Sequence, residues 1–163
     1  MKRQPTLVIL VGNIGSGKST LVKQIYSDCQ IISRDEWRYK LGCGNYLFDY
    51  GVEIKINCLV NLELQVAMQL GNDIVIDEMN MAKKTRKHYI NAAKEQNYRV
   101  MAVVFPDLGE EEHVRRRMES NHGYTTEQRW REVYRRNAQR FQMPTFEEGF
   151  DFVSGLPRDL CYE

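Results

Sequence analysis

The sequence predicts an α/β fold, with a parallel sheet of four or five strands flanked by helices. Strand-like and helix-like segments alternate along the 163 residues, which is the order that βαβ units require. The first strand-like segment, residues 6–11, is continuously apolar and rich in β-branched side chains, as expected for a strand buried on both faces. No linker or internal repeat interrupts the chain, so we expect residues 1–163 to form a single domain.

The other elements follow from apolar spacing and from the positions of glycine and proline. Residues 42–50 contain two glycines and an asparagine, and we expect them to form a loop. A long amphipathic helix over 52–70 is expected to end at Gly71. The remaining predicted helices are 18–26, 35–41, 82–95, 110–120 and 125–141, and the remaining predicted strands are 30–33, 73–77, 98–105 and an edge strand at 150–153.

Composition and charge exclude few functions. The net charge of +1 neither requires nor excludes a nucleic-acid partner, because local patches matter more than the total. No apolar run approaches the roughly 20 residues that span a bilayer, and the N-terminus lacks the features of a signal peptide, so no membrane partner is expected. The four cysteines, Cys29, Cys43, Cys58 and Cys161, lack paired metal-ligand spacing, which favours reduced thiols in the cytoplasm over a zinc site.

Residues 12–19 (GNIGSGKS) match the phosphate-binding pattern G-x-x-x-x-G-K-[ST], between a predicted strand and a predicted helix. Glycines let successive N–H groups point inward around an anion, and the helix adds its positive N-terminal end. Lys18 is expected to reach the β- and γ-phosphates of ATP, and the Ser19 hydroxyl to bind Mg²⁺. The predicted nucleotide site consists of Gly12, Asn13, Ile14, Gly15, Ser16, Gly17, Lys18, Ser19 and Thr20.

This motif predicts a P-loop NTPase fold, within which the size and the remaining motifs favour a kinase. An Asn-Lys-x-Asp segment that would read guanine is absent, which lowers the expectation of a GTPase. A chain of 163 residues also leaves little room for the arms of an ATP-driven motor.

Asp35 and Arg38 follow the second predicted strand. Residues just beyond the carboxyl end of such a strand face the ligand crevice, where a kinase needs a carboxylate to accept the proton of the attacking hydroxyl. Arg38 shares a helical face with Asp35 and is able to hold an acceptor phosphate with its bidentate fork. The alternative is a capping aspartate that forms an ordinary i,i+3 ion pair with Arg38.

The sequence resembles the kinase domain of phage and bacterial polynucleotide 5′-kinases. The matching residues are 12–20, the Arg34-Asp35-x-x-Arg38 signature and Ile76-Asp77-x-x-Asn80, followed by 114–116, 143–144 and 148–150. The resemblance covers nearly the whole chain and implies the strand order 2-3-1-4-5. The phosphatase signature Asp-x-Asp-Gly-Thr of the phage enzyme is absent, so only kinase activity is expected.

The resemblance also implies roles for individual residues. Asp35 is expected to be the general base, Arg38 to contact the phosphate 3′ to the acceptor nucleoside, and Asp77 and Asn80 to help build the acceptor pocket. Alternatively, Asp77 acts on Mg²⁺ indirectly, through a group that binds the ion, in the manner of a Walker-B carboxylate, or it is simply a strand-ending aspartate that caps the next turn.

The family covers the ATP phosphates with a lid helix that carries two arginines. Arg116 is expected to be the first, and an arginine there would stabilise charge on the transferring group. Ser120 and Asn121 occupy the positions expected for the second, so Arg117 or a residue of 121–124 is a candidate substitute. The alternative is a solvated basic helix face.

Two basic segments and one aromatic loop are candidates for contact with a nucleic acid. Residues 83–88 follow Asp77 and are expected beside the acceptor groove, where they would attract phosphates. The rings of Tyr46, Phe48 and Tyr50 are candidates to stack a terminal base, with core packing as the alternative. Arg129, Arg131, Arg135, Arg136 and Arg140 alternate with glutamates, and we favour a solvated helix face for them.

The expected activity is therefore that of a polynucleotide 5′-hydroxyl kinase, which transfers the γ-phosphoryl group of ATP to the 5′-hydroxyl of DNA or RNA. The partner would be a single-stranded or end-exposed nucleic acid. A kinase of a nucleoside, sugar or antibiotic is the nearest alternative, and a non-catalytic nucleotide-dependent regulatory or nucleic-acid-binding module is the second. The sequence leaves the oligomeric state open.

Overall fold

The computed structural model describes residues 3–120 and 125–156 and contains a five-stranded sheet in the order β2-β3-β1-β4-β5. Every pair of neighbouring strands is parallel, which confirms the α/β class and the expected strand order. The strands are β1 Thr6–Val11, β2 Gln30–Ile32, β3 Ile74–Ile76, β4 Arg99–Val104 and β5 Phe152–Gly155.

The central strand β1 is buried on both faces because its side chains alternate between two hydrophobic layers. Leu7 and Ile9 join one layer with buried residues of the neighbouring strands and of two long helices. Val8 and Leu10 join a second, smaller layer that includes Val22. The continuous apolar run in the sequence thus reflects a strand with no solvent-facing side.

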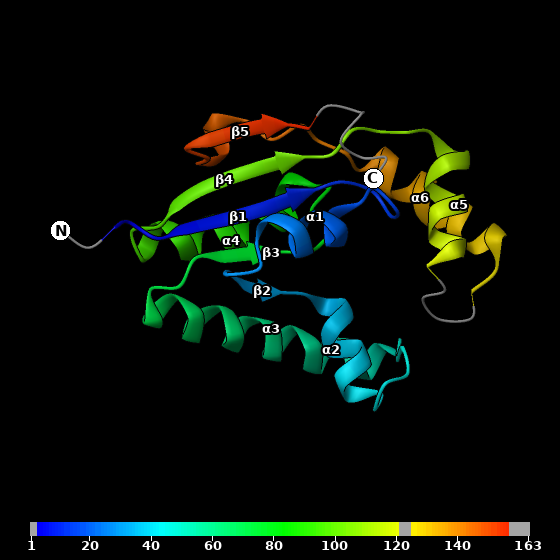
Figure 1. The fold of residues 1–163 in the computed structure, drawn as a ribbon, viewed down its shortest axis with the longest axis horizontal. Coiled ribbons are helices and arrows are strands. Elements are labelled where there is room, and N and C mark those ends of the chain that lie inside the picture. The colour runs from blue at the N-terminus through cyan, green and yellow to red at the C-terminus, as the bar shows by residue number, and fades with distance from the viewer. Residues whose placement is uncertain (1–2, 121–124, 157–163) are drawn as a thin grey trace.

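The helices cover both faces of the sheet and extend past the carboxyl ends of the strands (Figure 1). Helices α3 and α4 pack on the larger layer, and α1 packs on the smaller one. Helices α5 and α6 pack against each other on the side to which the strand arrows point. The bounds are α1 Lys18–Ile25, α2 Arg34–Leu41, α3 Tyr50–Leu70, α4 Lys83–Glu95, α5 Glu110–Glu119, α6 Glu127–Gln139 and the short 3₁₀ helix η1 Phe146–Glu148.

The structure departs from the predicted boundaries at two helix starts, which capping side chains explain, and at the edge strand. Helix α3 begins two residues earlier than expected, because the Asp49 carboxylate accepts hydrogen bonds from the N–H groups of Gly51 and Val52. Helix α6 begins later than expected because Thr126 is its N-cap. The edge strand β5 is shifted toward the C-terminus from residues 150–153, and Phe150 is buried in the core instead.

The helices in the described part of the chain include none that is long and apolar enough to cross a membrane.

Candidate active site

The loop between β1 and α1 curls as the phosphate-binding pattern predicts. Gly15 and Gly17 have positive φ angles of 61° and 93°, which residues with a Cβ rarely adopt. A Cβ on Gly15 would also lie 2.5 Å from the backbone oxygen of His113 in α5. The glycines therefore allow both the turn and the close approach of α5 to the loop.

Lys18 lies buried inside this loop and closes it. Its ammonium donates hydrogen bonds to the backbone oxygens of Gly12 and Asn13, at 2.9 and 2.7 Å, and to the Ser16 hydroxyl at 3.1 Å. Burial lowers the pKa of Lys18 to about 8, although the nearby Asp77 carboxylate opposes this shift. The ammonium is thus held at the centre of the loop, where the phosphates of a nucleotide would approach.

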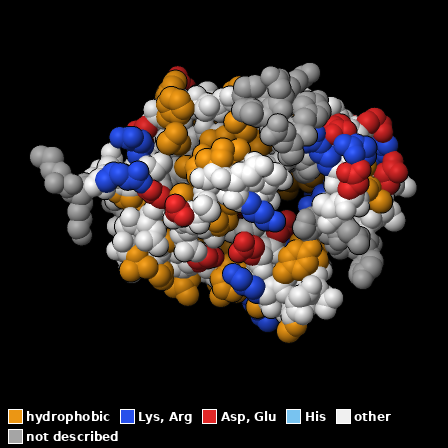
Figure 2. All heavy atoms as spheres, viewed as in Figure 1, with side chains coloured by type: hydrophobic (Ala, Val, Ile, Leu, Met, Phe, Trp, Pro, Cys, Tyr) orange, Lys and Arg blue, Asp and Glu red, His pale blue; other side chains and the backbone are white. Residues whose placement is uncertain are grey.

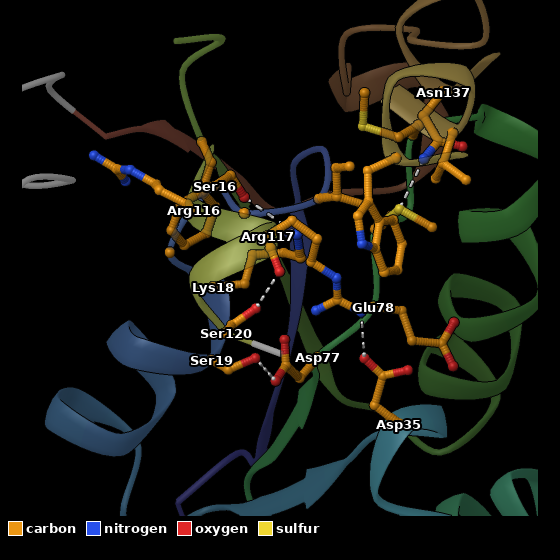
Figure 3. A pocket seen from close by; sticks show the side chains of 18 of the residues that line it. Ser16, Lys18, Ser19, Asp35, Asp77, Glu78, Arg116, Arg117, Ser120 and Asn137 are labelled. Carbon is orange, nitrogen blue, oxygen red and sulfur yellow. Dashed lines mark hydrogen bonds and ion pairs between the residues drawn. The ribbon is translucent and has the colours of Figure 1, made fainter. Parts of the chain in front are cut away.

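Ser19 and Asp77 meet across the base of the site. The Ser19 hydroxyl donates a 2.8 Å hydrogen bond to Asp77, which directly follows β3 (Figure 3). Burial raises the pKa of Asp77, with Ser19 and Lys18 acting in the opposite direction. A hydroxyl and a carboxylate side by side, next to a phosphate-binding loop, are oxygen ligands of the kind that Mg²⁺ prefers. The residues present therefore fit a Mg²⁺ ion bound together with nucleotide phosphates.

Asp35 lies in the first turn of α2, beyond the carboxyl end of β2, as predicted. Arg38 Nη1 donates to its Oδ1 at 2.5 Å, the Tyr46 hydroxyl donates to the same oxygen at 2.8 Å, and Arg117 Nη2 lies 3.9 Å from Oδ2. Burial alone would raise the pKa of Asp35, but Arg38, Tyr46 and Arg117 together hold it below its ordinary value. Asp35 is therefore ionised at neutral pH and able to accept a proton.

Arg38 forms the expected i,i+3 ion pair with Asp35 and also a second pair that the sequence did not reveal. Its Nε and Nη2 donate to the two carboxylate oxygens of Glu53 in α3, at 2.7 and 2.8 Å. The guanidinium also lies over the rings of Tyr46 and Phe48, at 5.6 and 5.1 Å from their centroids. The bidentate fork that we expected to hold an acceptor phosphate thus holds Glu53 in this structure.

Asn80 and Asn13 are buried and connect backbone segments around the site. Asn80 has a positive φ of 47° and donates to the backbone oxygen of Leu10 in β1 at 2.9 Å. Asn13 donates to the backbone oxygen of Tyr134 in α6 at 3.0 Å. These bonds attach the end of β1 to the β3–α4 segment, and the phosphate-binding loop to α6.

The three arginines of α5, the helix expected to carry the lid arginines, have different environments. Arg115 is exposed and pairs with Glu112 and Glu119, as expected for a solvated face. Arg116, the predicted lid arginine, is largely buried beside Gly15 and donates to Glu112 at 2.6 Å. Arg117 points toward Asp35 in Figure 3. The residues 121–124 that were also candidates for the second lid arginine lie outside the described part of the chain.

Arg117 was only an alternative in the sequence, yet it has the most central position of the three. Its guanidinium stacks on the ring of Trp130 in α6, with 4.5 Å between the guanidinium carbon and the ring centroid. Its charge is close enough to Lys18 to contribute to the lowered pKa of that lysine. Arg117 therefore lies among the groups that would surround a transferring phosphoryl group.

Helix α5 also braces the phosphate-binding loop through a buried histidine. The Nε2 of His113 accepts a hydrogen bond from the backbone N–H of Leu108 at 3.1 Å, so the proton is on Nδ1, which donates to the Ile14 backbone oxygen at 2.6 Å. Burial lowers the pKa of His113, which favours this neutral form. The position of α5 and the shape of the phosphate-binding loop are thus linked.

Only some residues of the basic segment 83–88 and of the aromatic loop line the candidate site. Within 83–88, Arg86 is fully buried and holds Glu148 through two hydrogen bonds, while Thr85 lines the site. Tyr46 and Phe48 line the site beside Asp35, whereas Tyr50 is 84% exposed and begins α3. Most of the basic segment is therefore structural or peripheral, and two of the three aromatic residues belong to the site.

A single cavity of about 1240 Å³ unites these groups. The predicted site residues that line it are Ile14, Gly15, Ser16, Gly17, Lys18, Ser19, Thr20, Asp35, Arg38, Asp77, Asn80 and Arg116, while Gly12 and Asn13 contribute the backbone oxygens that hold Lys18. Sequence reasoning missed Glu53 and Trp130, because neither belongs to a motif and each reaches the site through a long-range contact.

Comparison with known proteins places this site in a family. Residues 7–144 match a family described as an AAA domain. The chain is 26% identical, over 158 residues, to a predicted bifunctional polynucleotide phosphatase/kinase of Acanthamoeba polyphaga mimivirus. A solved Pnkp1/Rnl/Hen1 complex contains a chain that is 28% identical, with a TM-score of 0.60 over 71% of this chain. A second structure, titled as the Pnkp1/Rnl/Hen1 RNA repair complex, matches in fold with 24% identity and a TM-score of 0.67 over 87% of this chain.

These relatives are longer than the chain. The 93% of the chain that aligns with the mimivirus protein spans 33% of that protein, and the matches span 40% and 48% of the two solved chains. Because the family model matches most of the chain, the chain belongs to this AAA domain family, and its resemblance to polynucleotide kinases is confirmed.

Proposed function

We propose that the chain transfers the γ-phosphoryl group of ATP to the 5′-hydroxyl end of a nucleic acid. The observation that carries the proposal is the position of Asp35, an ionised carboxylate that lines the same cavity as Lys18 and the Ser19–Asp77 pair. A phosphate-binding loop alone is compatible with many functions. A general base that follows β2 and lines the same cavity as the phosphate-binding loop supports transfer to a hydroxyl acceptor.

In the proposed reaction the 5′-oxygen of the acceptor forms a bond to the γ-phosphorus, and the bond from that phosphorus to the β–γ bridging oxygen breaks. The acceptor proton goes to the Asp35 carboxylate, and ADP is the leaving group. Lys18 would neutralise charge on the β- and γ-phosphates, and Mg²⁺ held at Ser19 and Asp77 would do the same for the phosphate oxygens. Arg116 and Arg117 would stabilise the three oxygens of the transferring group.

Polynucleotide acceptors are supported by the relatives and by the charges near Asp35. The relatives named above are a polynucleotide phosphatase/kinase and chains of complexes that contain Pnkp1, one of them titled as an RNA repair complex. Arg38 and Arg117 lie beside Asp35, where a phosphate attached to the acceptor nucleoside would bring complementary charge.

One observation favours a kinase of a neutral small molecule as the second candidate. The Arg38 guanidinium is already paired with Glu53 and Asp35, so its charge is balanced without an acceptor phosphate. An acceptor phosphate would have to share Arg38 with Glu53 or displace it. The two candidates therefore differ in whether the acceptor must carry a phosphate.

The test is label transfer from γ-labelled ATP to two oligonucleotides of the same sequence, one with a 5′-hydroxyl and one with a 5′-phosphate. We expect label only on the 5′-hydroxyl strand, released as a nucleoside 5′-monophosphate after digestion. Asp35→Asn is the matched control, because it keeps the shape of the side chain and removes the base. Absence of transfer to every 5′-hydroxyl strand, with transfer to a nucleoside or sugar, would overturn the proposal in favour of the second candidate.

A further inference from the structure

Four arginines on α6 and at its C-cap, Arg140, fall into two groups, and the division suggests an extended contact with the acceptor. Arg131 bridges Glu110, Glu111 and Glu127, and Arg135 pairs with Glu110. Figure 2 shows these red and blue side chains interleaved over α5 and α6. This group joins the two helices and faces solvent, as the sequence predicted.

Arg136 and Arg140 differ from this group. Among the described residues, no carboxylate, backbone oxygen or aromatic ring pairs with either guanidinium, and both side chains line the cavity that holds Asp35 and Asp77. They are four residues apart, so their backbones lie about 6 Å apart along the helix axis, on the same face. Two unpaired like charges on one face of a cavity make a site for an anionic ligand.

Hydrogen bonds place the C-terminal end of α6 beside the segment that follows Asp77. Asn137 Nδ2 donates to the Met79 sulfur at 3.0 Å, and the Gln142 N–H, just past α6, donates to the Met81 backbone oxygen at 2.9 Å. The side-chain oxygen of Gln142 accepts from the Lys83 N–H at the start of α4. In Figure 3 Asn137 lies at the end of the pocket away from Ser19.

Asn137 also donates to the side-chain oxygen of Asn13 in the phosphate-binding loop, at 3.2 Å, so the C-terminal half of α6 lies between that loop and the β3–α4 segment. The phosphates of ATP would be held by Lys18 and by the N–H groups at the start of α1, whereas Arg136 and Arg140 neighbour in sequence Asn137 and Gln142, which contact the β3–α4 segment. A strand whose 5′ end is at Asp35 carries one phosphate per nucleotide onward from that end. Guanidinium groups one turn apart are suited to contact successive phosphates of such a strand.

We propose that Arg136 and Arg140 bind the phosphates of the acceptor strand beyond its first nucleotide, so that the enzyme prefers strands of several nucleotides. The inference rests on the proposed function and deepens it by naming where the rest of the strand binds. Arg135 offers a matched control on the same helix, because it pairs with Glu110 and does not line the cavity.

The experiment measures kcat/KM for nucleoside 3′-monophosphate and for 5′-hydroxyl strands of two, four and eight nucleotides. For the wild type we expect kcat/KM to rise about tenfold or more from the monophosphate to the four-nucleotide strand, the scale of one charge-assisted contact or more. Arg136→Ala combined with Arg140→Ala should remove most of that rise. The kcat/KM for the nucleoside 3′-monophosphate and the KM for ATP should stay within about threefold of the wild-type values. Arg135→Ala should retain the wild-type length dependence.

Salt dependence gives a second readout. The slope of log affinity against log salt for an eight-nucleotide 5′-hydroxyl strand, measured by fluorescence anisotropy, should fall by about 1.4 in the double variant, because each lost phosphate contact on a single strand is worth about 0.7. An unchanged length dependence and salt slope would overturn the inference. A uniform loss on all acceptors, or a raised KM for ATP, would also overturn it, because the arginines would then belong to the phosphoryl-transfer site.

The same measurements separate this inference from the proposed function. If the wild type phosphorylates no strand but still binds a strand through Arg136 and Arg140, the proposed function is wrong and the inferred contact of these arginines with the strand is supported. If kcat/KM is the same for strands of every length, the proposed function is supported and the inferred contact of Arg136 and Arg140 with the strand is wrong.

Discussion

Lys18 occupies the centre of the phosphate-binding loop with its own hydrogen bonds satisfied by backbone oxygens. A bound nucleotide would have to draw the ammonium toward the β- and γ-phosphates and away from these partners. The Lys18 amine must be protonated to bind the phosphates in this way, and burial lowers the pKa of Lys18 to about 8. Nucleotide affinity is therefore coupled to the protonation of a single residue.

The coupling predicts how ATP binding depends on pH. Below about pH 8 Lys18 is charged in the free protein, and ATP binding needs no proton uptake at this site. Above that pH the free protein loses the proton that the phosphates require, so the Kd for ATP should rise by up to about tenfold per pH unit. Titration calorimetry at pH 7, 8, 9 and 9.5 measures this.

Lys18→Arg is the control, since arginine stays charged over this range and should give a flatter profile even if its affinity is lower. A wild-type Kd that is constant from pH 7 to 9.5 would contradict the assigned role of Lys18.

Asp35 is the residue on which catalysis depends most directly. Asp35→Asn should lower kcat by about 10²-fold or more, the usual scale for loss of a general base, with little change in ATP affinity. Because Arg38, Tyr46 and Arg117 hold the pKa of Asp35 below its ordinary value, the carboxylate should stay ionised and active at a pH where an ordinary aspartate begins to be protonated. Steady-state kinetics and ATP binding separate the two effects. If ATP affinity collapses instead, Asp35 belongs to the nucleotide site.

At the scale of elements, the β3–α4 segment is the feature that connects the site to the rest of the fold. It begins with Asp77, and its Met79 backbone oxygen accepts from the Gly12 N–H at 3.0 Å. Arg86 holds the same segment from α4, with Nη1 donating to the backbone oxygens of Asn80 and Met81. The fully buried Arg86–Glu148 pair adds η1 to this group.

Removal of Arg86 should therefore destabilise the protein strongly. Arg86→Ala leaves the Glu148 carboxylate and two backbone oxygens buried without their donor, which should lower the free energy of unfolding by about 3–5 kcal/mol. Chemical denaturation measures this change. Lys87→Ala is the matched control on the exposed side of α4 and should stay within about 0.5 kcal/mol of the wild type. Equal stability of the two variants would show that the buried pair does not hold this segment.

At the scale of the whole molecule, the sequence specified the sheet better than the site. Continuous apolar strands such as 6–11 and glycines such as Gly71 are local signals, so the elements were predictable and the resemblance supplied the strand order. Asp35 and Lys18 could be named because they belong to motifs. The pairing of Arg38 with Glu53, fifteen residues away and on another helix, depends on how α2 packs on α3, and spacing alone does not reveal it.

Long-range packing also explains why the sequence did not single out Arg117 among the arginines of α5. The motif favoured Arg116, because it occupies the expected position in the sequence, but the stacking of Arg117 on Trp130 depends on how α5 and α6 pack. The arginines of α6 appeared uniform in the sequence. The structure divides them, because only one face of that helix meets the glutamates of α5.

A nucleic acid end as the acceptor is tested by the ratio of kcat/KM for a nucleoside 3′-monophosphate to kcat/KM for the bare nucleoside. A charge-assisted contact from Arg38 predicts a ratio of about 10 to 150, and the competing Glu53 contact places the expectation near the lower end. Arg38→Ala should erase most of the preference, and Arg38→Lys should restore only part of it. Equal wild-type turnover of the nucleoside and its 3′-phosphate would contradict the account and favour a small-molecule kinase.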